Sequence, residues 1–102
     1  MKRDNRMDGL SWIEEWYESH CNGEWEEIYG VNIVTLDNPG WLIEIDVLET
    51  DLENKAFTVV DIDNSDDDWI RCEVKNGKFV GVGDKTKLSD IINIFKEWCH
   101  NT

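Results

Sequence analysis

The chain has 102 residues, of which 40% are apolar and six are tryptophan. A chain of this length has room for one hydrophobic core, so we expect a single domain spanning residues 1–102. Its 10 basic and 23 acidic residues give a net charge of −13, which repels nucleic acid and anionic membrane surfaces. The composition therefore argues against binding to nucleic acid or membranes and favours a partner with a basic surface.

The cysteines indicate a reducing compartment. The chain has an odd number of cysteines that lie far apart in sequence: Cys21, Cys72 and Cys99. This is typical of free core thiols rather than a disulfide framework. The start, MKRDNRMDG, has no apolar run that would form an export signal, and no apolar run reaches the about 18 residues of a membrane span. We therefore expect a cytoplasmic protein.

Residues 8–23, DGLSWIEEWYESHCNG, have the pattern of an amphipathic helix. Ser11 and Glu14 form an S-x-x-E capping box at its start, and Asn22-Gly23 supplies a residue able to take a positive φ at its end. Positions at helical spacing form one aromatic-rich stripe that we expect to pack on a sheet: Ile13, Trp16, Tyr17 and His20.

Five segments have the alternation and flanking turns of strands: residues 31–36, 41–48, 56–62, 68–75 and 78–83. The turn sequence DNPG joins the first two, and Asn76-Gly77, the strongest hairpin signal in the chain, joins the last two. In the second strand one face is apolar and the other carries Glu44 and Asp46. The strands therefore predict a sheet with one buried and one partly acidic face.

The segment KLSDIINIFKEWCHNT predicts a C-terminal helix with Ser89 as its cap. Its apolar side consists of Leu88, Ile91, Ile92, Phe95, Trp98 and Cys99. The predicted fold class is α+β, a five-stranded mainly antiparallel sheet with an N-terminal and a C-terminal helix packed on one face. The opposite face would be open to water or a partner, with these charged residues on it: Glu44, Asp46, Arg71, Glu73 and Lys75.

The acidic run DIDNSDDDW is similar to a calcium loop, but the match is incomplete. Asp61, Asp63, Ser65 and Asp67 occupy positions 1, 3, 5 and 7 of an EF-hand-like loop. Asp66 then stands where the loop requires glycine, and the flanking segments look like strands. We interpret the run as a solvated connector rather than a metal site.

Zinc binding and catalysis are the other chemical hypotheses. His20-Cys21 and Cys99-His100 could supply four zinc ligands, but adjacent ligands chelate zinc poorly. A Cys-His dyad lacks a setting that would lower the thiol pKa, and paired carboxylates occur by chance in so acidic a chain. We predict no catalytic residue, metal or cofactor; the alternative is a small acidic metal-binding or enzymatic module centred on the Cys21–Trp41 loops.

The stretch CNGEWEEIYGVNIVTLDNPGW, Cys21 to Trp41, has a high density of specialised residues. Helix termination, a turn and core packing by its tryptophans account for part of it, whereas loop positions more commonly carry function. Together with the acidic strand face and the acidic run, it supplies our candidate partner-binding residues: Trp25, Glu26, Glu27, Asp37, Asn38, Trp41, Glu44, Asp46, Asp67 and Asp68.

This stretch resembles the immunity protein 53 family, found beside toxin genes in bacterial polymorphic toxin systems. The family core C-[ND]-G-x-W-E is present from Cys21 to Glu26, and T-L-D-N-P-G-W is present from Thr35 to Trp41. Glu27 departs from the family, which often has histidine there. Further agreement extends over nearly the whole chain, at Asp68, Trp69, Cys72, Phe79, Gly81, Leu88, Phe95 and Trp98.

The resemblance implies a cytosolic, non-enzymatic protein that binds and neutralises a cognate toxin. A nuclease toxin needs a basic surface to hold nucleic acid, which an acidic inhibitor could occupy or flank. Two interpretations of the CNGEWE and LDNPGW segments remain open: they contact the toxin, or they maintain the family's fold while a variable surface meets each toxin.

Overall fold

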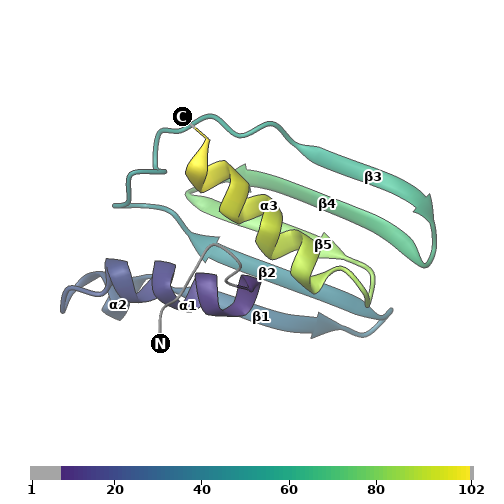
Figure 1. Ribbon diagram of the computed structural model, residues 1–102, viewed down its shortest axis with the longest axis horizontal. Helices are drawn as coiled ribbons and strands as arrows, with labels where there is room; N and C mark the ends of the chain where they lie inside the picture. Colours follow the sequence, from purple (N-terminus) through teal and green to yellow (C-terminus); the bar gives the residue numbers. More distant parts are fainter. Residues whose placement is uncertain (1–7, 102) are drawn as a thin grey trace.

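The structure of the protein is a computed structural model that describes residues 8–101. The expectation that no export signal is present falls mainly on residues 1–7, which lie outside the described residues. In chain order the elements are α1 (Gly9–His20), α2 (Trp25–Ile28), β1 (Val31–Leu36), β2 (Gly40–Asp46), β3 (Val60–Ser65), β4 (Asp68–Lys75), β5 (Lys78–Gly83) and α3 (Leu88–His100), as shown in Figure 1.

The strands form one sheet in the order β1-β2-β5-β4-β3, and every neighbouring pair is antiparallel. The two predicted hairpins, β1–β2 and β4–β5, are both present, with Asn76 and Gly77 at positive φ in the second turn. The long connection after β2 carries the chain to the far edge, where β3 pairs only with β4. The predicted α+β fold is therefore confirmed.

Helices α1 and α3 lie side by side on one face of this sheet (Figure 1), and the core lies between them and the strands. Its central side chains are fully buried, among them Phe79, Phe95 and Ile45. Gly81 in β5 allows α3 to approach, because a Cβ there would overlap the Cγ2 methyl group of Ile91. None of the described helices is long and apolar enough to cross a membrane.

The start of α1 differs from the prediction. The helix begins at Gly9, and the carboxylate of Asp8 accepts a hydrogen bond of 2.7 Å from the backbone N–H of Ser11. Aspartate at this position satisfies a backbone donor that the helix itself leaves open. The expected capping box of Ser11 and Glu14 is therefore wrong, because both residues already lie inside the helix.

The predicted cap of α3 is also wrong. The helix begins at Leu88 after Lys87, which makes no side-chain capping bond, and Ser89 falls within the first turn. The apolar stripe is as expected: Ile91, Ile92, Phe95 and Trp98 are buried. Burial of the stripe against the sheet, rather than a cap, therefore holds this helix in place.

The third strand begins later than predicted, at Val60 rather than at residue 56. The preceding segment is bound to α3 instead: the indole N–H of Trp98 donates to the carbonyl of Ala56 at 2.8 Å, and Lys55 donates to the carbonyls of Trp98 and Asn101. These bonds hold the chain beside the helix end, so it joins β4 only from Val60 onward.

Candidate interaction surface

The face of the sheet opposite α1 and α3, called here the outer face, is covered by no described helix. The strand register places one row of side chains across it, apolar on β1, β2 and β5 and charged on β4 and β3: Val34, Leu42, Val82, Arg71 and Asp61. Val34 is 46% exposed, and Leu42 and Val82 are half-buried. The outer face therefore has an apolar part on β1, β2 and β5 beside a charged part on β4 and β3, a combination that is common in protein-binding surfaces.

Most carboxylates on the outer face pair with basic neighbours. Arg71 contacts Asp61 at 2.7 Å and Glu73 at 3.4 Å, and Lys78 contacts Asp46 at 3.3 Å. Asp46 also accepts a hydrogen bond of 2.9 Å from the backbone N–H of Gly30, which fixes the chain just before β1. Exposed ion pairs of this kind stabilise a fold only weakly, so they remain able to exchange partners.

Glu44 differs from these carboxylates. It stands on β2 between Asn32 of β1 and Val80 of β5, and its side chain bonds no other residue in the described part of the chain. Of the two predicted acids on this strand, Glu44 is therefore available to a partner, whereas Asp46 already serves the fold.

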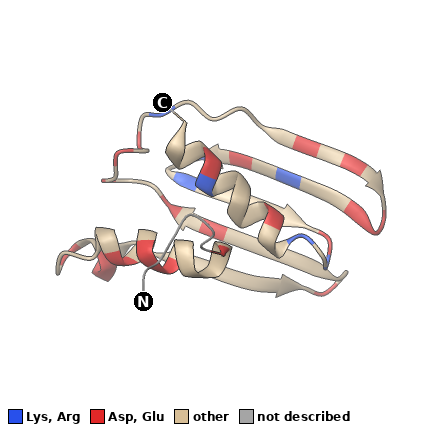
Figure 2. Ribbon diagram, viewed as in Figure 1, with Lys and Arg blue, Asp and Glu red and all other residues tan. Residues whose placement is uncertain are grey.

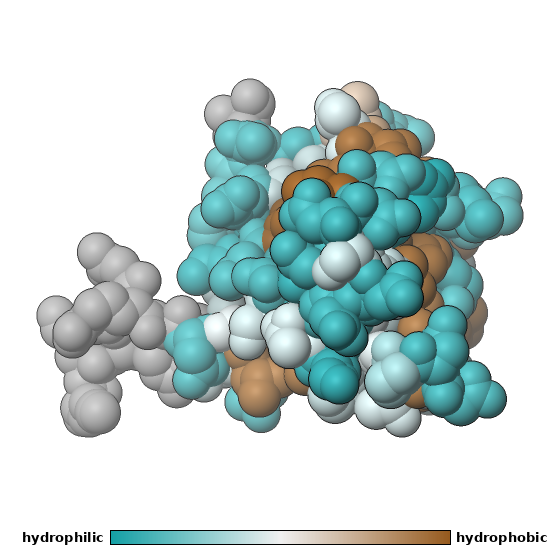
Figure 3. Space-filling view, turned by 90° about the vertical axis from the view of Figure 1, so that its right-hand side faces the viewer, coloured by the Kyte–Doolittle hydropathy of each residue, from teal (hydrophilic) through white to brown (hydrophobic). Residues whose placement is uncertain are grey.

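The structure brings two predicted segments together at one end of the sheet. A hollow of about 330 Å³ is lined by residues of the β1–β2 turn and of the acidic run: Asn38, Asp63, Ser65, Asp66 and Trp69. Asp37, Asn38 and Asp67 are exposed there. Figure 3 shows the molecule from this end. The visible surface is mostly hydrophilic, with smaller hydrophobic areas in between.

Asp68, another predicted binding residue, belongs to a structural cluster that the sequence reasoning missed. Lys87 lies 2.8 Å from both Asp68 and the buried Asp84. Asp84 also accepts hydrogen bonds from the backbone N–H of Trp69 and from the N–H and hydroxyl of Thr86. The cluster joins the start of β4 to the loop that leads into α3.

The electrostatics of this cluster favour its charged form. Burial alone would raise the pKa of Asp84, but hydrogen bonds from Lys87, Thr86 and Trp69 outweigh it and hold that pKa well below its ordinary value. Hydrogen bonds to Asp68 and Asp84 raise the pKa of Lys87. The spacing of Asp84 and Thr86 is a turn signal that could have located this cluster from sequence.

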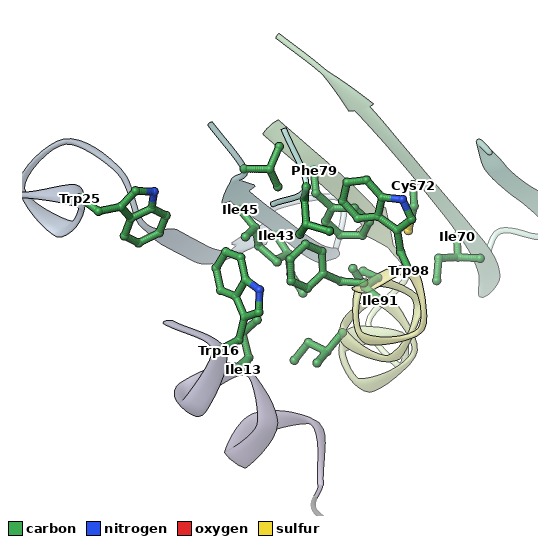
Figure 4. Close-up of a cluster of buried hydrophobic side chains, with 14 residues drawn as sticks. Ile13, Trp16, Trp25, Ile43, Ile45, Ile70, Cys72, Phe79, Ile91 and Trp98 are labelled. Carbon is green, nitrogen blue, oxygen red and sulfur yellow. The ribbon is translucent and has the colours of Figure 1, made fainter. Parts of the chain in front are cut away.

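Trp25 is a core residue rather than a loop contact. It opens α2, a single helical turn that the sequence did not predict, and only 4% of it is exposed. Its indole N–H donates to the carbonyl of Leu48 at 3.0 Å, and its ring meets Trp16 edge to face, with 6.0 Å between ring centroids. Figure 4 shows Trp25 at the α2 end of the buried cluster.

Glu26 and Asn22 close the loop before α2. The Asn22 side chain accepts bonds from the N–H groups of Glu24 and Trp25, and the Glu26 carboxylate accepts bonds from those of Asn22 and Gly23. Gly23 takes a positive φ of 95°, as its position predicted. Bonds from the backbone N–H groups of Glu26 itself, Asn22 and Gly23 lower the pKa of Glu26.

The remaining predicted residues also include some that support the fold and some that stay open. Trp41 lies in β2, half-buried, with its indole N–H bonded to the carbonyl of Lys85 at 3.1 Å. Glu27 is exposed, and its side chain bonds no other described residue. The predicted set is thus part scaffold and part open surface, and its open members are Glu27, Asp37, Asn38, Glu44 and Asp67.

Three of the four predicted zinc-ligand candidates line a separate groove, which Cys21 does not line. The C-terminal ends of α1 and α3 place His20, Cys99 and His100 along a hollow of about 690 Å³. Even so, the described residues contain no group of three or more His, Cys, Asp or Glu that could hold a metal ion. Burial, followed by the nearby Asp51, raises the pKa of Cys99 to about 12, which makes it a poor nucleophile at neutral pH.

Comparison with known proteins agrees with the motifs described above. The family model for immunity protein 53 matches residues 10–100, which is most of the chain. Comparisons with curated proteins and with solved structures give no match. The chain belongs to the immunity protein 53 family, and this membership supports an immunity function.

Proposed function

We propose that this protein neutralises a cognate bacterial toxin by binding it one to one, without catalysis. The observation that carries the proposal is an open outer face, apolar on β1, β2 and β5 and charged on β4 and β3, on a member of an immunity family. Inhibition by binding requires a surface but no activated nucleophile or metal. The outer face and the neighbouring acidic turns supply such a surface.

The charge of the protein indicates the chemistry of the toxin. With a net charge of −13, the protein attracts a basic surface, such as the one by which a nuclease holds its substrate. Glu44, Asp37 and Asp67 would face this surface, while the apolar row around Leu42 would give the buried centre of the contact. In this proposal the protein acts in the cytoplasm of the cell that it protects.

Co-expression tests the proposal. The chain is produced together with the polypeptide encoded immediately upstream of it, and survival and recovery of a complex are scored. We expect rescue and a one-to-one complex. Cell death with no complex, in the presence of a folded chain, would overturn direct neutralisation.

Charge reversal locates the surface. Glu44→Lys places a positive charge on the outer face, and Glu97→Lys places the same charge on the exposed side of α3. We expect Glu44→Lys to weaken rescue and Glu97→Lys to leave it intact. The reverse result would move the contact to the helical side of the molecule.

A further inference from the structure

The two edges of the sheet differ in chemistry. β1 reads VNIVTL and has no charged residue, whereas β3 reads VDIDNS and carries Asp61 and Asp63 (Figure 2). β3 also has a register irregularity between Asp63 and Ser65. Charges and bulges protect an edge strand from pairing with other strands, and β1 has neither.

The hydrogen-bond pattern shows which backbone groups of β1 face the outside edge of the sheet, with which no described strand pairs. Asp46 donates its backbone N–H to the carbonyl of Gly30, one residue before β1, at 3.0 Å. Hydrogen-bonded pairs alternate along an antiparallel ladder, so Asn32, Val34 and Leu36 bond β2. The N–H and C=O groups that point away from the sheet belong to Val31, Ile33 and Thr35.

Apolar side chains lie on both sides of this edge. Ile33 is 36% exposed on the side of the helices, and Val34 is 46% exposed on the outer face. Leu10 and Tyr17 are two helical turns apart on α1, 55% and 37% exposed, on the flank turned away from the residues that meet α3. A strand added next to β1 would therefore find apolar contacts above and below it.

We propose that β1 is the place where a strand of the cognate toxin pairs, extending the sheet by one strand. This inference rests on the proposed function and names the part of the surface that holds the toxin. The six residues of β1 span about 20 Å, which suits a strand of similar length. Main-chain bonds would give affinity, and apolar side chains at alternate positions of the toxin strand would give specificity.

Charge favours a basic toxin over a second copy of this chain. Glu14 and Glu18 are exposed on α1, and Glu44 lies on the strand next to β1. A second copy would bring the same acids and another net charge of −13 to the edge, whereas basic residues flanking a toxin strand would meet these acids favourably.

The edge is also continuous with the outer face. Val34 of β1 stands directly beside Leu42 of β2 in the ladder. Pairing of one strand alone buries less than the about 800 Å² per partner that stable complexes bury. A toxin strand on β1 would therefore bring the rest of the toxin over the adjoining apolar row.

The first test compares the binding of two matched variants to a purified toxin domain. The probe is the toxin domain encoded beside this chain. Ile33→Lys adds a hydrated charge to the β1 edge, and Ile62→Lys adds the same charge on the same face at the opposite edge, where Ile62 is 49% exposed. We expect Ile33→Lys to raise Kd by about tenfold or more, and Ile62→Lys to change it by about twofold at most.

The second test addresses the backbone. Thr35→Pro removes an N–H that points to the open edge and breaks no bond to β2, a position where edge strands tolerate proline. Thr35→Val changes the side chain but keeps the N–H. Loss of one hydrogen bond predicts a Kd about tenfold higher for Thr35→Pro, with Thr35→Val close to wild type.

The outcomes separate this inference from the proposed function. Circular dichroism and Tm first establish that each variant is folded. If Ile33→Lys and Thr35→Pro bind as tightly as wild type while Glu44→Lys binds weakly, the edge inference is wrong and the function stands. If the wild-type protein itself binds no toxin, both the edge inference and the proposed function are wrong. If wild type alone sediments as a dimer that Ile33→Lys dissociates, the occupant is a second copy and the inference is overturned.

Discussion

The indole Nε1 of Trp25 lies 3.0 Å from the carbonyl oxygen of Leu48 and joins α2 to the segment that follows β2. Because Trp25 is also 4% exposed, both its polar atom and its ring are committed to the fold. One of the most specific residues of the CNGEWE motif therefore holds the scaffold together.

Substitution of Trp25 should reduce stability. Removal of a buried tryptophan ring leaves a cavity, so we expect Trp25→Ala to lower the free energy of unfolding by about 3–5 kcal/mol. Trp25→Phe keeps much of the packing but leaves the Leu48 carbonyl without its donor, at a cost of about 1–3 kcal/mol. Urea unfolding measures both. Unchanged stability combined with lost toxin binding would instead make Trp25 a contact residue.

The neighbouring Glu26 and Glu27 form a matched pair. Glu26 accepts bonds from the N–H groups of Asn22 and Gly23, whereas the Glu27 side chain bonds no other described residue. Thermal melts at pH 7 should therefore show a lower Tm for Glu26→Gln and an almost unchanged Tm for Glu27→Gln. Equal Tm values would mean that the loop closes without this carboxylate.

The Glu26 effect should also depend on pH. Its folded-state pKa is lowered, so its contribution is fully present above the unfolded pKa of about 4.3 and is lost as pH falls through the folded value. The difference in Tm between wild type and Glu26→Gln should therefore narrow below about pH 4. A constant difference down to pH 3 would contradict the lowered pKa.

The ion pair between Lys87 and Asp84 predicts that the folded state keeps its stability over a wide range of pH. Asp84 has a lowered pKa, so its stabilisation persists above about pH 4, and Lys87 has a raised pKa, so its stabilisation persists until pH rises beyond about 10. Asp84→Asn should lower Tm throughout this range, and the deficit should shrink in acid. Melts of wild type and Asp84→Asn from pH 3 to pH 9 measure it.

Much of the fold could be predicted because its signals are local. Period-two runs placed β1 and β2, Asn76-Gly77 placed the β4–β5 turn, and the stripe around Phe95 placed α3. The late start of β3 could not be predicted, because it depends on bonds from Lys55 and Trp98, residues far apart in sequence. Long-range hydrogen bonds here override local strand propensity.

For a related reason, the sequence could not separate the candidate residues that support the fold from those that stay open. Residue type does not distinguish a carboxylate that faces water from one that accepts backbone bonds, so Glu44 and Asp46 looked equivalent on the same strand. The neighbouring residues distinguish the two carboxylates. Gly30 and Lys78 bond Asp46, whereas Asn32 and Val80 lie beside Glu44 and do not bond its carboxylate. Similarly, Trp25 looked like a loop residue because α2 is only one turn long.

Thiol chemistry gives a further prediction. Burial raises the pKa of Cys72 to about 12, and burial together with Asp51 raises that of Cys99 to about 12. The thiolate is the reactive form, so both should resist alkylation in the native protein at pH 8. Mass spectrometry should find label only at Cys21 until denaturant is added. Rapid native labelling of Cys72 would show that the core opens readily.

Association with the toxin should be sensitive to salt. A chain of net charge −13 attracts a basic partner over long distances, and salt screens this attraction, whose range falls to about 8 Å at 0.15 M ionic strength. Raising the salt concentration should therefore slow association by about tenfold or more and change dissociation much less, because the apolar row around Leu42 is insensitive to screening. Stopped-flow or surface-binding kinetics separate the two rates. An association rate that does not respond to salt would remove charge from the explanation and leave the apolar row and the β1 edge as the source of recognition.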